Sequence, residues 1–228
     1  MTIHYHGTPI TPVDALYQLA GRHFCVSHAR PDDVERVHDI GQSVMLDNGA
    51  FSAWKRGHEP DWSAYYAWTD RWLHFPETWA VIPDVVDGGS QLQDALILQW
   101  PHGERGAPVW HMDEPMDRLL RLVDHWPRVC VGSTEEYQDV LSAPWRRRMD
   151  QMWDEVAKRH PRLPKLHMLR GMQLAGKHWP FASLDSTNIA QNHNRPQNTP
   201  KSMADRLDGL QCPGRWDIAT SEQLELIA

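Results

Sequence analysis

Val44-Met45-Leu46-Asp47-Asn48-Gly49-Ala50-Phe51 is a short apolar run that ends in an aspartate and continues into small and polar residues. Phe181-Ala182-Ser183-Leu184-Asp185-Ser186-Thr187-Asn188 has the same form, and Trp79-Ala80-Val81-Ile82-Pro83-Asp84 repeats it. An apolar run of this length is typical of a buried strand. A strand that ends at a carboxylate places a charge at the rim of a sheet, where α/β enzymes keep their catalytic groups. The three endings therefore predict one shared site.

The rest of the chain alternates short apolar runs with amphipathic segments, which is the pattern of a parallel sheet. The predicted strands are His23–Ser27, Val44–Asp47, Trp79–Asp84, Pro108–Met112, Arg128–Gly132, Leu166–Arg170 and Phe181–Asp185. The predicted helices are Val13–Ala20, Asp32–Asp39, Asp61–Phe75, Gln91–Trp100, Met116–His125, Pro144–His160 and Ser202–Leu210. Asp61, Ser90 and Ser142 are predicted helix caps.

Seven strands with helices between them come close to a (β/α)8 barrel, although an eighth strand is not evident. We therefore predict an α/β, TIM-barrel-like fold that is trimmed or incompletely closed. An open doubly wound sheet is the alternative, but no Gly-x-Gly-x-x-Gly turn follows the first strand. With no linker-like or low-complexity stretch in its 228 residues, the chain 1–228 is expected to form a single domain.

Composition excludes several classes of protein. No apolar run is long enough to span a membrane and the first residues do not resemble a signal peptide, so we expect a soluble, cytoplasmic protein. Cys25, Cys130 and Cys212 are distant and odd in number, which argues against a disulfide framework or a cysteine zinc site. His4 and His6 are interpreted as part of a flexible amino terminus rather than a metal pair.

The formal net charge of −7 removes the simplest argument for a duplex-binding protein, which usually carries a basic excess. Local basic clusters occur at Arg146-Arg147-Arg148 and from Lys165 to Lys177. Nucleic acid therefore stays open as a partner.

A barrel would gather several polar residues at the carboxyl ends of its strands. Each aspartate could instead only cap the helix that follows it, but three aspartates beside glycine turns favour a ligand site. A nucleophile elbow, a phosphate loop and a His-Glu-x-x-His motif are absent from the sequence. The residues expected to meet are Asp47, Asn48, Asp84, His111, Gly132, Ser133 and Asp185.

Two of these segments resemble a known family. Asp47-Asn48-Gly49-Ala50-Phe51 resembles the Asp-Ser-Gly-Gly-Phe motif of tRNA-guanine transglycosylases, whose aspartate lies at the bound purine. Leu184-Asp185-Ser186 resembles the Phe-Asp-Cys segment that carries their nucleophilic aspartate, and Met168–Met172 resembles the stretch before it. The match is nearer to the DpdA-type proteins of phages and bacterial DNA-modification clusters, whose Asp-Ser-Gly-Ala-Phe-Ser is almost Asp47 to Ser52.

The resemblance runs roughly over residues 23–198 and implies a barrel that exchanges a purine base at an N-glycosidic bond. It makes Asp185 the nucleophile, and Asp47 the group that holds the purine edge and moves protons. Asp84 falls where the family reads the base and His111 where it has a glutamine. By the same analogy Phe51 lines or stacks on the base. The other predicted substrate-binding residues are Asn48, Gly49, Gly132, Ser133 and, just past Asp185, Asn188, Asn192, His193 and Arg195.

Two interpretations of residues 188–195 are left open. The segment could bind the sugar or a flanking phosphate, or it could be a polar loop without a binding role. The family's Cys-x-Cys-x-x-Cys zinc site is missing, since only Cys212 lies in that region. This departure favours DNA over tRNA as the nucleic-acid partner, with a free purine or 7-deazapurine base as the second substrate. The chemistry needs no cofactor and no metal. A homodimer, a phage origin and the identity of the base are left open.

Two other functions fit the same residues. One is a hydrolytic N-glycosidase, in which water takes the place of the incoming base, and the other is a non-catalytic barrel that binds a nucleotide. A radical enzyme that uses S-adenosylmethionine is disfavoured, because the sequence has no Cys-x-x-x-Cys-x-x-Cys motif.

Overall fold

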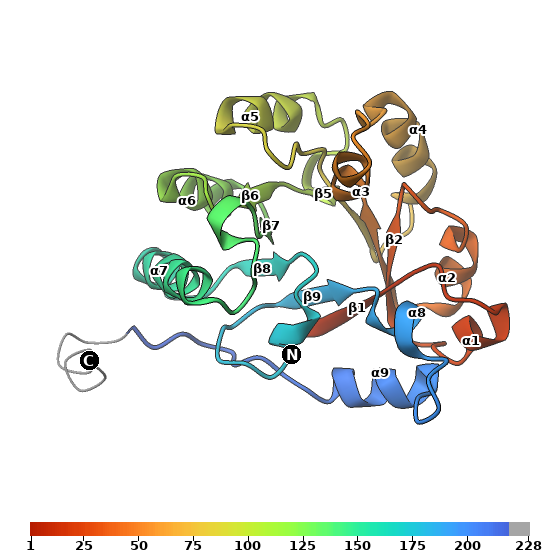
Figure 1. Cartoon of the computed structure of the whole chain (residues 1–228). Helices are drawn as coiled ribbons and strands as arrows, with labels where there is room; N and C mark the ends of the chain where they lie inside the picture. The colour runs from red at the N-terminus through yellow and green to blue at the C-terminus, as the bar shows by residue number, and fades with distance from the viewer. Residues whose placement is uncertain (219–228) are drawn as a thin grey trace.

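Nine parallel strands form one sheet in the computed structural model, which describes residues 1–218, and helices surround this sheet (Figure 1). The order across the sheet is β5-β4-β3-β2-β1-β9-β8-β7-β6. The strands are β1 Ile3–Gly7, β2 His23–Ser27, β3 Ser43–Asp47, β4 Thr78–Val81, β5 Gly106–Ala107, β6 Val109–His111, β7 Arg128–Gly132, β8 Lys165–Met168 and β9 Ser183–Ser186. The α-helices are α1 Val13–Tyr17, α2 Val34–Ile40, α3 Ala50–Lys55, α4 Trp62–Trp72, α5 Ser90–Gln99, α6 Met116–His125, α7 Ala143–Arg159, α8 Asn188–Asn192 and α9 Pro200–Asp208.

The sheet closes almost completely into a barrel. Its two end strands, β5 and β6, are separated in sequence only by Pro108. The first of them pairs with β4 and the second with β7, so one extended segment joins both edges. Proline has no N–H to donate to a ladder, and the pairing changes partner at this residue. The nine strands thus occupy eight positions with one unsealed seam, which confirms the predicted incompletely closed (β/α)8 barrel.

The strand that the sequence did not reveal is β1, which pairs with β2 on one side and β9 on the other. The prediction of a flexible amino terminus is wrong. His4 and His6 are 2% and 1% exposed, and His6 Nε2 lies 3.1 Å from Asp208 Oδ1 on α9. The preceding Thr2 donates its N–H to Gln211 Oε1 at 2.6 Å. Polar side chains cover the outer face of β1, so no apolar run marks it.

The helix predictions are confirmed in existence, with shifted ends. Asp61 and Ser142 cap α4 and α7, since their side chains accept the N–H of Ala64 and Trp145. Ser90 is not a cap, because α5 begins at Ser90 itself and Gly89 takes the cap position. The short helices α3 and α8 were not predicted. No helix within the described part of the chain is both long and apolar enough to cross a bilayer.

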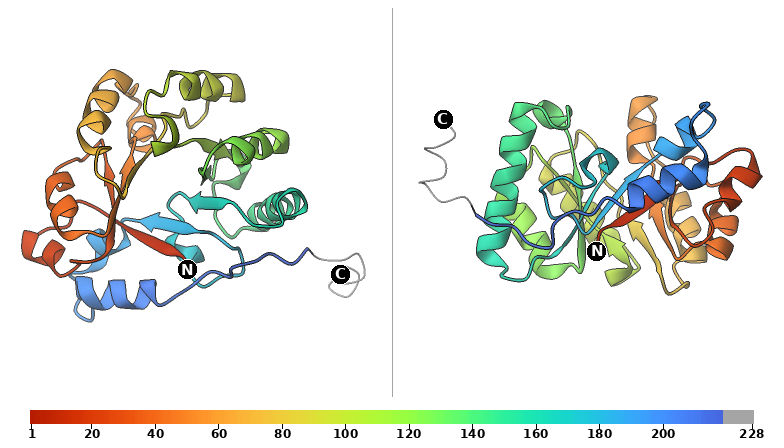
Figure 2. Two further views of the ribbon diagram at one scale, coloured as in Figure 1. Left: turned by 180° about the vertical axis from the view of Figure 1, so that it is seen from behind. Right: turned by 90° about the horizontal axis from the view of Figure 1, so that it is seen from below.

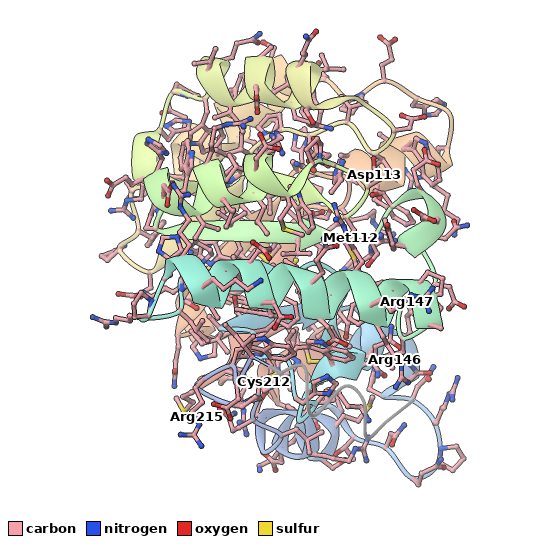
Figure 3. All side chains as sticks on the ribbon, turned by 90° about the vertical axis from the view of Figure 1, so that its left-hand side faces the viewer. Met112, Asp113, Arg146, Arg147, Cys212 and Arg215 are labelled. Carbon is pink, nitrogen blue, oxygen red and sulfur yellow. The ribbon has the colours of Figure 1, made fainter. Side chains whose placement is uncertain are left out.

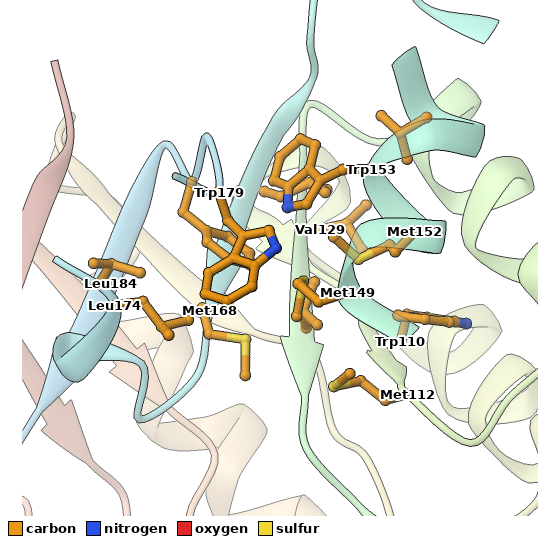
Figure 4. Packing of buried hydrophobic residues seen from close by; sticks show 14 of the residues in the cluster. Trp110, Met112, Val129, Met149, Met152, Trp153, Met168, Leu174, Trp179 and Leu184 are labelled. Atoms are coloured by element: carbon orange, nitrogen blue, oxygen red, sulfur yellow. The ribbon is translucent and has the colours of Figure 1, made fainter. Parts of the chain in front are cut away.

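Side chains fill the barrel interior, and a larger apolar layer lies between strands and helices. The interior includes Cys25 and Cys130, which are buried free thiols. Outside the barrel, α7 places apolar residues against β7, β8 and β9 (Figure 4). The buried residues of α7 are Trp145, Met149, Met152, Trp153 and Val156, which share one helix face. Figure 2 shows from two further directions that the helices lie outside the strands. This packing holds the carboxyl ends of the strands in place.

Candidate active site

The carboxyl ends of the strands open into a cavity of about 380 Å³. This volume lies in the range of roughly 300–1,000 Å³ that is typical of small-molecule sites. The position agrees with the end of a (β/α)8 barrel where catalytic groups are found. The predicted residues that line the cavity are Asp47, Asn48, Phe51, Asp84, His111, Gly132, Ser133 and Asp185.

Asp47 ends β3, and a glycine turn directs the chain from it into α3. Gly49 has φ +77°, a left-handed conformation that glycine adopts readily, and its N–H donates to Asp47 Oδ2 at 3.2 Å. A Cβ at Gly49 would lie 3.2 Å from the Ala29 nitrogen. Gly49 therefore forms the turn and does not line the cavity. Burial raises the pKa of Asp47 to about 6, and the negative charges of Asp185 and Asp84 add to the shift.

Asp84 is held by two neighbours, Asn48 and His111. Asn48 Nδ2 donates to Asp84 Oδ1 at 2.7 Å and to the Ile82 carbonyl at 2.9 Å, while its Oδ1 accepts the N–H of Ala50. The amide is thus engaged on both atoms and positions Asp84. His111 Nε2 lies 2.9 Å from Asp84 Oδ2.

The charge state of His111 is set by a competition. Burial favours the neutral ring, but the hydrogen bond and charge of Asp84 outweigh it, with help from Glu114 and Asp113, so the pKa of His111 is raised. Gly132 lies directly beside the ring, and a Cβ there would be 2.9 Å from His111 Cδ2. Only glycine leaves His111 its place beside Asp84.

Asp185 lies on β9 and is 8% exposed. Its Oδ1 accepts the Arg170 N–H at 2.7 Å and lies 3.2 Å from His167 Nε2. Its Oδ2 has no hydrogen bond with any residue that the structure describes. One oxygen of this cavity-lining carboxylate is therefore fixed, and the other is left without a partner among the described residues.

Arg170 follows β8 and was not predicted as a site residue, although it lies in the segment 168–172 that resembles the family. Its backbone is left-handed, with φ +54°, and its guanidinium carbon lies 3.7 Å from the ring centroid of Phe51. Such a contact combines cation–π attraction with a flat wall. Among the described residues that line the cavity, Arg170 is the one lysine or arginine.

A second wall of uncharged polar side chains was also missed by the sequence analysis. It comes from the ends of β1, β2 and β9 and from α8, and no apolar-run pattern marks these residues. They are Thr8, Ser27, Ser186, Thr187 and Gln191. This wall offers hydroxyl and amide groups to a polar ligand such as a sugar.

Besides Gly49, four predicted substrate-binding residues do not line the cavity: Asn188, Asn192, His193 and Arg195. Two of them bond to their own helix instead, since Asn192 Nδ2 donates to the Asn188 carbonyl and His193 Nδ1 lies 2.9 Å from the Ile189 carbonyl. The side of α8 that faces the cavity carries Gln191. Ser133 lines the cavity, but its Oγ also accepts the indole N–H of Trp145 at 2.9 Å.

The basic cluster Arg146-Arg147-Arg148 lies at the amino-terminal end of α7, on the same side as Asp113 in Figure 3. Arg148 Nε donates to the Met112 carbonyl at 2.8 Å and Arg146 Nε to the Leu141 carbonyl at 2.7 Å. Both side chains therefore form hydrogen bonds with backbone carbonyl groups of neighbouring loops. None of these arginines lines the cavity.

Within residues 1–218, no group of three or more histidine, cysteine, aspartate or glutamate side chains is arranged to hold a metal ion. The arrangement offers three carboxylates, one imidazole and one guanidinium around one cavity, which suits nucleophilic attack coupled to proton transfer. The chain matches no protein-family model, no curated protein and no solved structure.

Proposed function

We propose that this protein exchanges a purine base at an N-glycosidic bond, most simply guanine in DNA for a 7-deazaguanine. The observation that carries the proposal is the meeting of Asp47, Asp84 and Asp185 in one cavity. The three differ in their surroundings, which suits three different tasks. The resemblance of Asp47–Phe51 and Leu184–Ser186 to the transglycosylase motifs supports the same assignment.

In the proposed reaction, Asp185 Oδ2 attacks the sugar C1′ as the bond from C1′ to the purine nitrogen breaks. The electron pair of that bond goes to the departing base, and Asp47 in its protonated form supplies the proton. An incoming base then attacks C1′, Asp185 leaves as a carboxylate, and Asp47 takes up the proton of the new base. Carboxylates form such covalent sugar intermediates in retaining glycosidases.

The surroundings of Asp47 and Asp84 support these roles. A pKa of about 6 allows Asp47 to hold a proton and release it near neutral pH. Asp84, fixed by Asn48 and His111, is available to accept hydrogen bonds from the edge of the base, and the Phe51–Arg170 pair offers a flat wall beside it. In duplex DNA the target nucleotide would have to leave the stack to reach the cavity, at a cost of a few kcal/mol. Such a reaction belongs in the cytoplasm of a bacterial or phage-infected cell.

The test is an exchange assay with radiolabelled guanine in DNA and in tRNA, with and without free 7-deazaguanines. We expect label to leave DNA only when a deazapurine is added. Release without it would indicate the hydrolytic N-glycosidase, and release from neither polymer would contradict the proposal.

Asp185→Asn tests the nucleophile within the same assay. The amide cannot form the sugar ester, so exchange should fall by at least about 10³-fold while the fold is retained. Asp39→Asn is the matched control, because Asp39 is an exposed aspartate on α2, and it should keep full activity. A fully active, well-folded Asp185→Asn protein would refute the assignment.

A further inference from the structure

The cavity contains two aspartate–histidine pairs that differ in kind. Asp84 and His111 form the first, in which the pKa of the imidazole is raised. Asp185 and His167 form the second, in which burial lowers the pKa of His167. His111 therefore favours a cationic ring and His167 a neutral one. A neutral His167 adds no positive charge beside Asp185.

His167 lies on β8 inside the barrel and is fully buried, with 0% exposure. The rings of Tyr5 and Trp79 pack edge-on against it, with centroid distances of 5.9 Å and 5.3 Å. Its Nδ1 lies 2.8 Å from Ser183 Oγ, and its Nε2 lies 3.2 Å from Asp185 Oδ1. Both ring nitrogens are therefore engaged, and two aromatic rings restrain the imidazole.

These contacts assign the tautomer of the ring. An ionised carboxylate can only accept hydrogen bonds, so Nε2 must carry the hydrogen that points to Asp185. The neutral ring then has no hydrogen on Nδ1, which accepts the hydroxyl proton of Ser183. Ser183 lies two residues before Asp185 on the same strand. Strand β9 therefore carries both residues that hydrogen-bond to the His167 ring.

The consequence concerns the two oxygens of Asp185. Oδ1 receives two donors, the Arg170 N–H and His167 Nε2–H, which restrain rotation of the carboxylate. Oδ2 receives none from the described residues, and Asp185 lines the cavity. A nucleophile restrained in this way loses less freedom on reaching the transition state.

We propose that His167, oriented by Ser183, is a positioning residue that holds Asp185 Oδ1 and leaves Oδ2 as the attacking oxygen. This role rests on the proposed function, since it presumes attack by Asp185. A purely structural histidine would affect folding and substrate binding as well as turnover. A positioning residue affects the rate of the chemical step and leaves binding unchanged.

The test compares two amide replacements of His167. In His167→Gln the amide nitrogen can occupy the place of Nε2 and still donate to Asp185, whereas in His167→Asn it can reach only the place of Nδ1. We expect the Gln variant to keep kcat within about 3-fold of the wild type. The Asn variant should lose about 100-fold in kcat, the usual effect of removing one oriented partner, with KM for both substrates within about 2-fold.

Ser183→Ala is the second variant, because removal of one hydroxyl leaves the core volume nearly unchanged. It should lower kcat by about 10-fold through loss of tautomer control, again without a change in KM. Equal kcat values for His167→Gln and His167→Asn would overturn the proposal. If the Asn variant does not fold, an unchanged kcat in Ser183→Ala would overturn it.

The two proposals fail in different ways. A wild-type protein that neither exchanges nor releases a base would refute the proposed function and this role with it. An active wild type, an inactive Asp185→Asn and a fully active His167→Asn would refute the role of His167 alone.

Discussion

Asp47 shows how a single half-buried carboxylate can reduce stability in favour of chemistry. Its pKa is about 6 in the folded protein against an ordinary value of 3.8, so the folded state binds the proton more tightly than the unfolded chain does. Between about pH 4 and pH 6 the unfolded state ionises first, and stability falls as the pH rises. Above that window the folded protein carries the full penalty of a buried charge.

Asp47→Asn should therefore stabilise the protein while it removes activity. Because Asp47 is half-buried, we expect a gain of about 1–3 kcal/mol in unfolding free energy near neutral pH. The gain should be much smaller at about pH 4, where the folded aspartate is already neutral. Urea denaturation at both pH values measures the difference. A gain that does not depend on pH, or a loss at neutral pH, would contradict the expected protonation.

At this scale the sequence predicts part of the site. Asp47, Asp84 and Asp185 could be expected together because each follows an apolar run, and parallel strands end at one rim. Arg170 could not be, since its stack on Phe51 depends on how β8 and α3 are placed in space. Gln191 lines the cavity in place of the predicted Asn192. Which of the two faces the cavity depends on the rotation of the short helix α8 about its axis, and no periodic sequence pattern determines that rotation.

Among the elements, β1 determines whether the barrel can close. It supplies the only described link between β2 and β9, and its central residue Tyr5 points into the interior. The Tyr5 hydroxyl accepts hydrogen bonds from Trp79 Nε1 at 2.9 Å and from Ser43 Oγ at 3.2 Å. One hydroxyl thus connects β1 with β3 and β4 across the interior.

Tyr5→Phe should destabilise the protein by about 1–3 kcal/mol, because it leaves the buried Trp79 Nε1 without an acceptor and removes one of the two partners of Ser43 Oγ. Tyr17→Phe provides the control, since Tyr17 is 50% exposed on α1 and should change stability by less than about 0.5 kcal/mol. Thermal or urea unfolding of the two variants gives the comparison. Equal effects would show that the interior contacts of Tyr5 do not stabilise the barrel.

Helices and strands were predictable where one face is buried by apolar residues that recur at a regular spacing. All seven predicted helices exist because their apolar residues recur at helical spacing. The strand β1 was missed because His4 and His6 face α9 through a carboxylate, Asp208, and not through apolar contacts. The segment Pro108–Met112 was predicted as one strand, whereas the extended region begins at Gly106 and changes partner at the proline.

For the whole molecule, the barrel is weakly paired at the seam beside Pro108, where β5 has only two residues. The β8–β9 ladder also contains only two residue pairs, but each of its strands has four residues. The β4–β5 ladder contains two residue pairs and the β2–β3 ladder contains five. Local opening begins where few backbone hydrogen bonds must break. The barrel should therefore open first between β4 and β5.

Hydrogen exchange can measure this difference by mass spectrometry of peptides. Peptides over 78–82 and 104–111 should exchange at least about 10-fold faster than those over 23–27 and 43–47. Both sets of segments lie in the barrel, so the second set serves as the internal reference. Uniform protection across the two sets would show that the seam is as stable as the continuous ladders.

The place of β1 between β2 and β9 also has a consequence for synthesis on the ribosome. Residues 3–7 leave the exit tunnel before the other described strands and can meet β2 soon afterwards, but β9 is about 180 residues away in the sequence. Throughout elongation one edge of the growing sheet is left open, with backbone groups available to other nascent chains. A chaperone that covers this edge until residue 186 emerges should raise the yield of folded protein during synthesis. The same chaperone should raise the yield by less when the full-length chain is refolded.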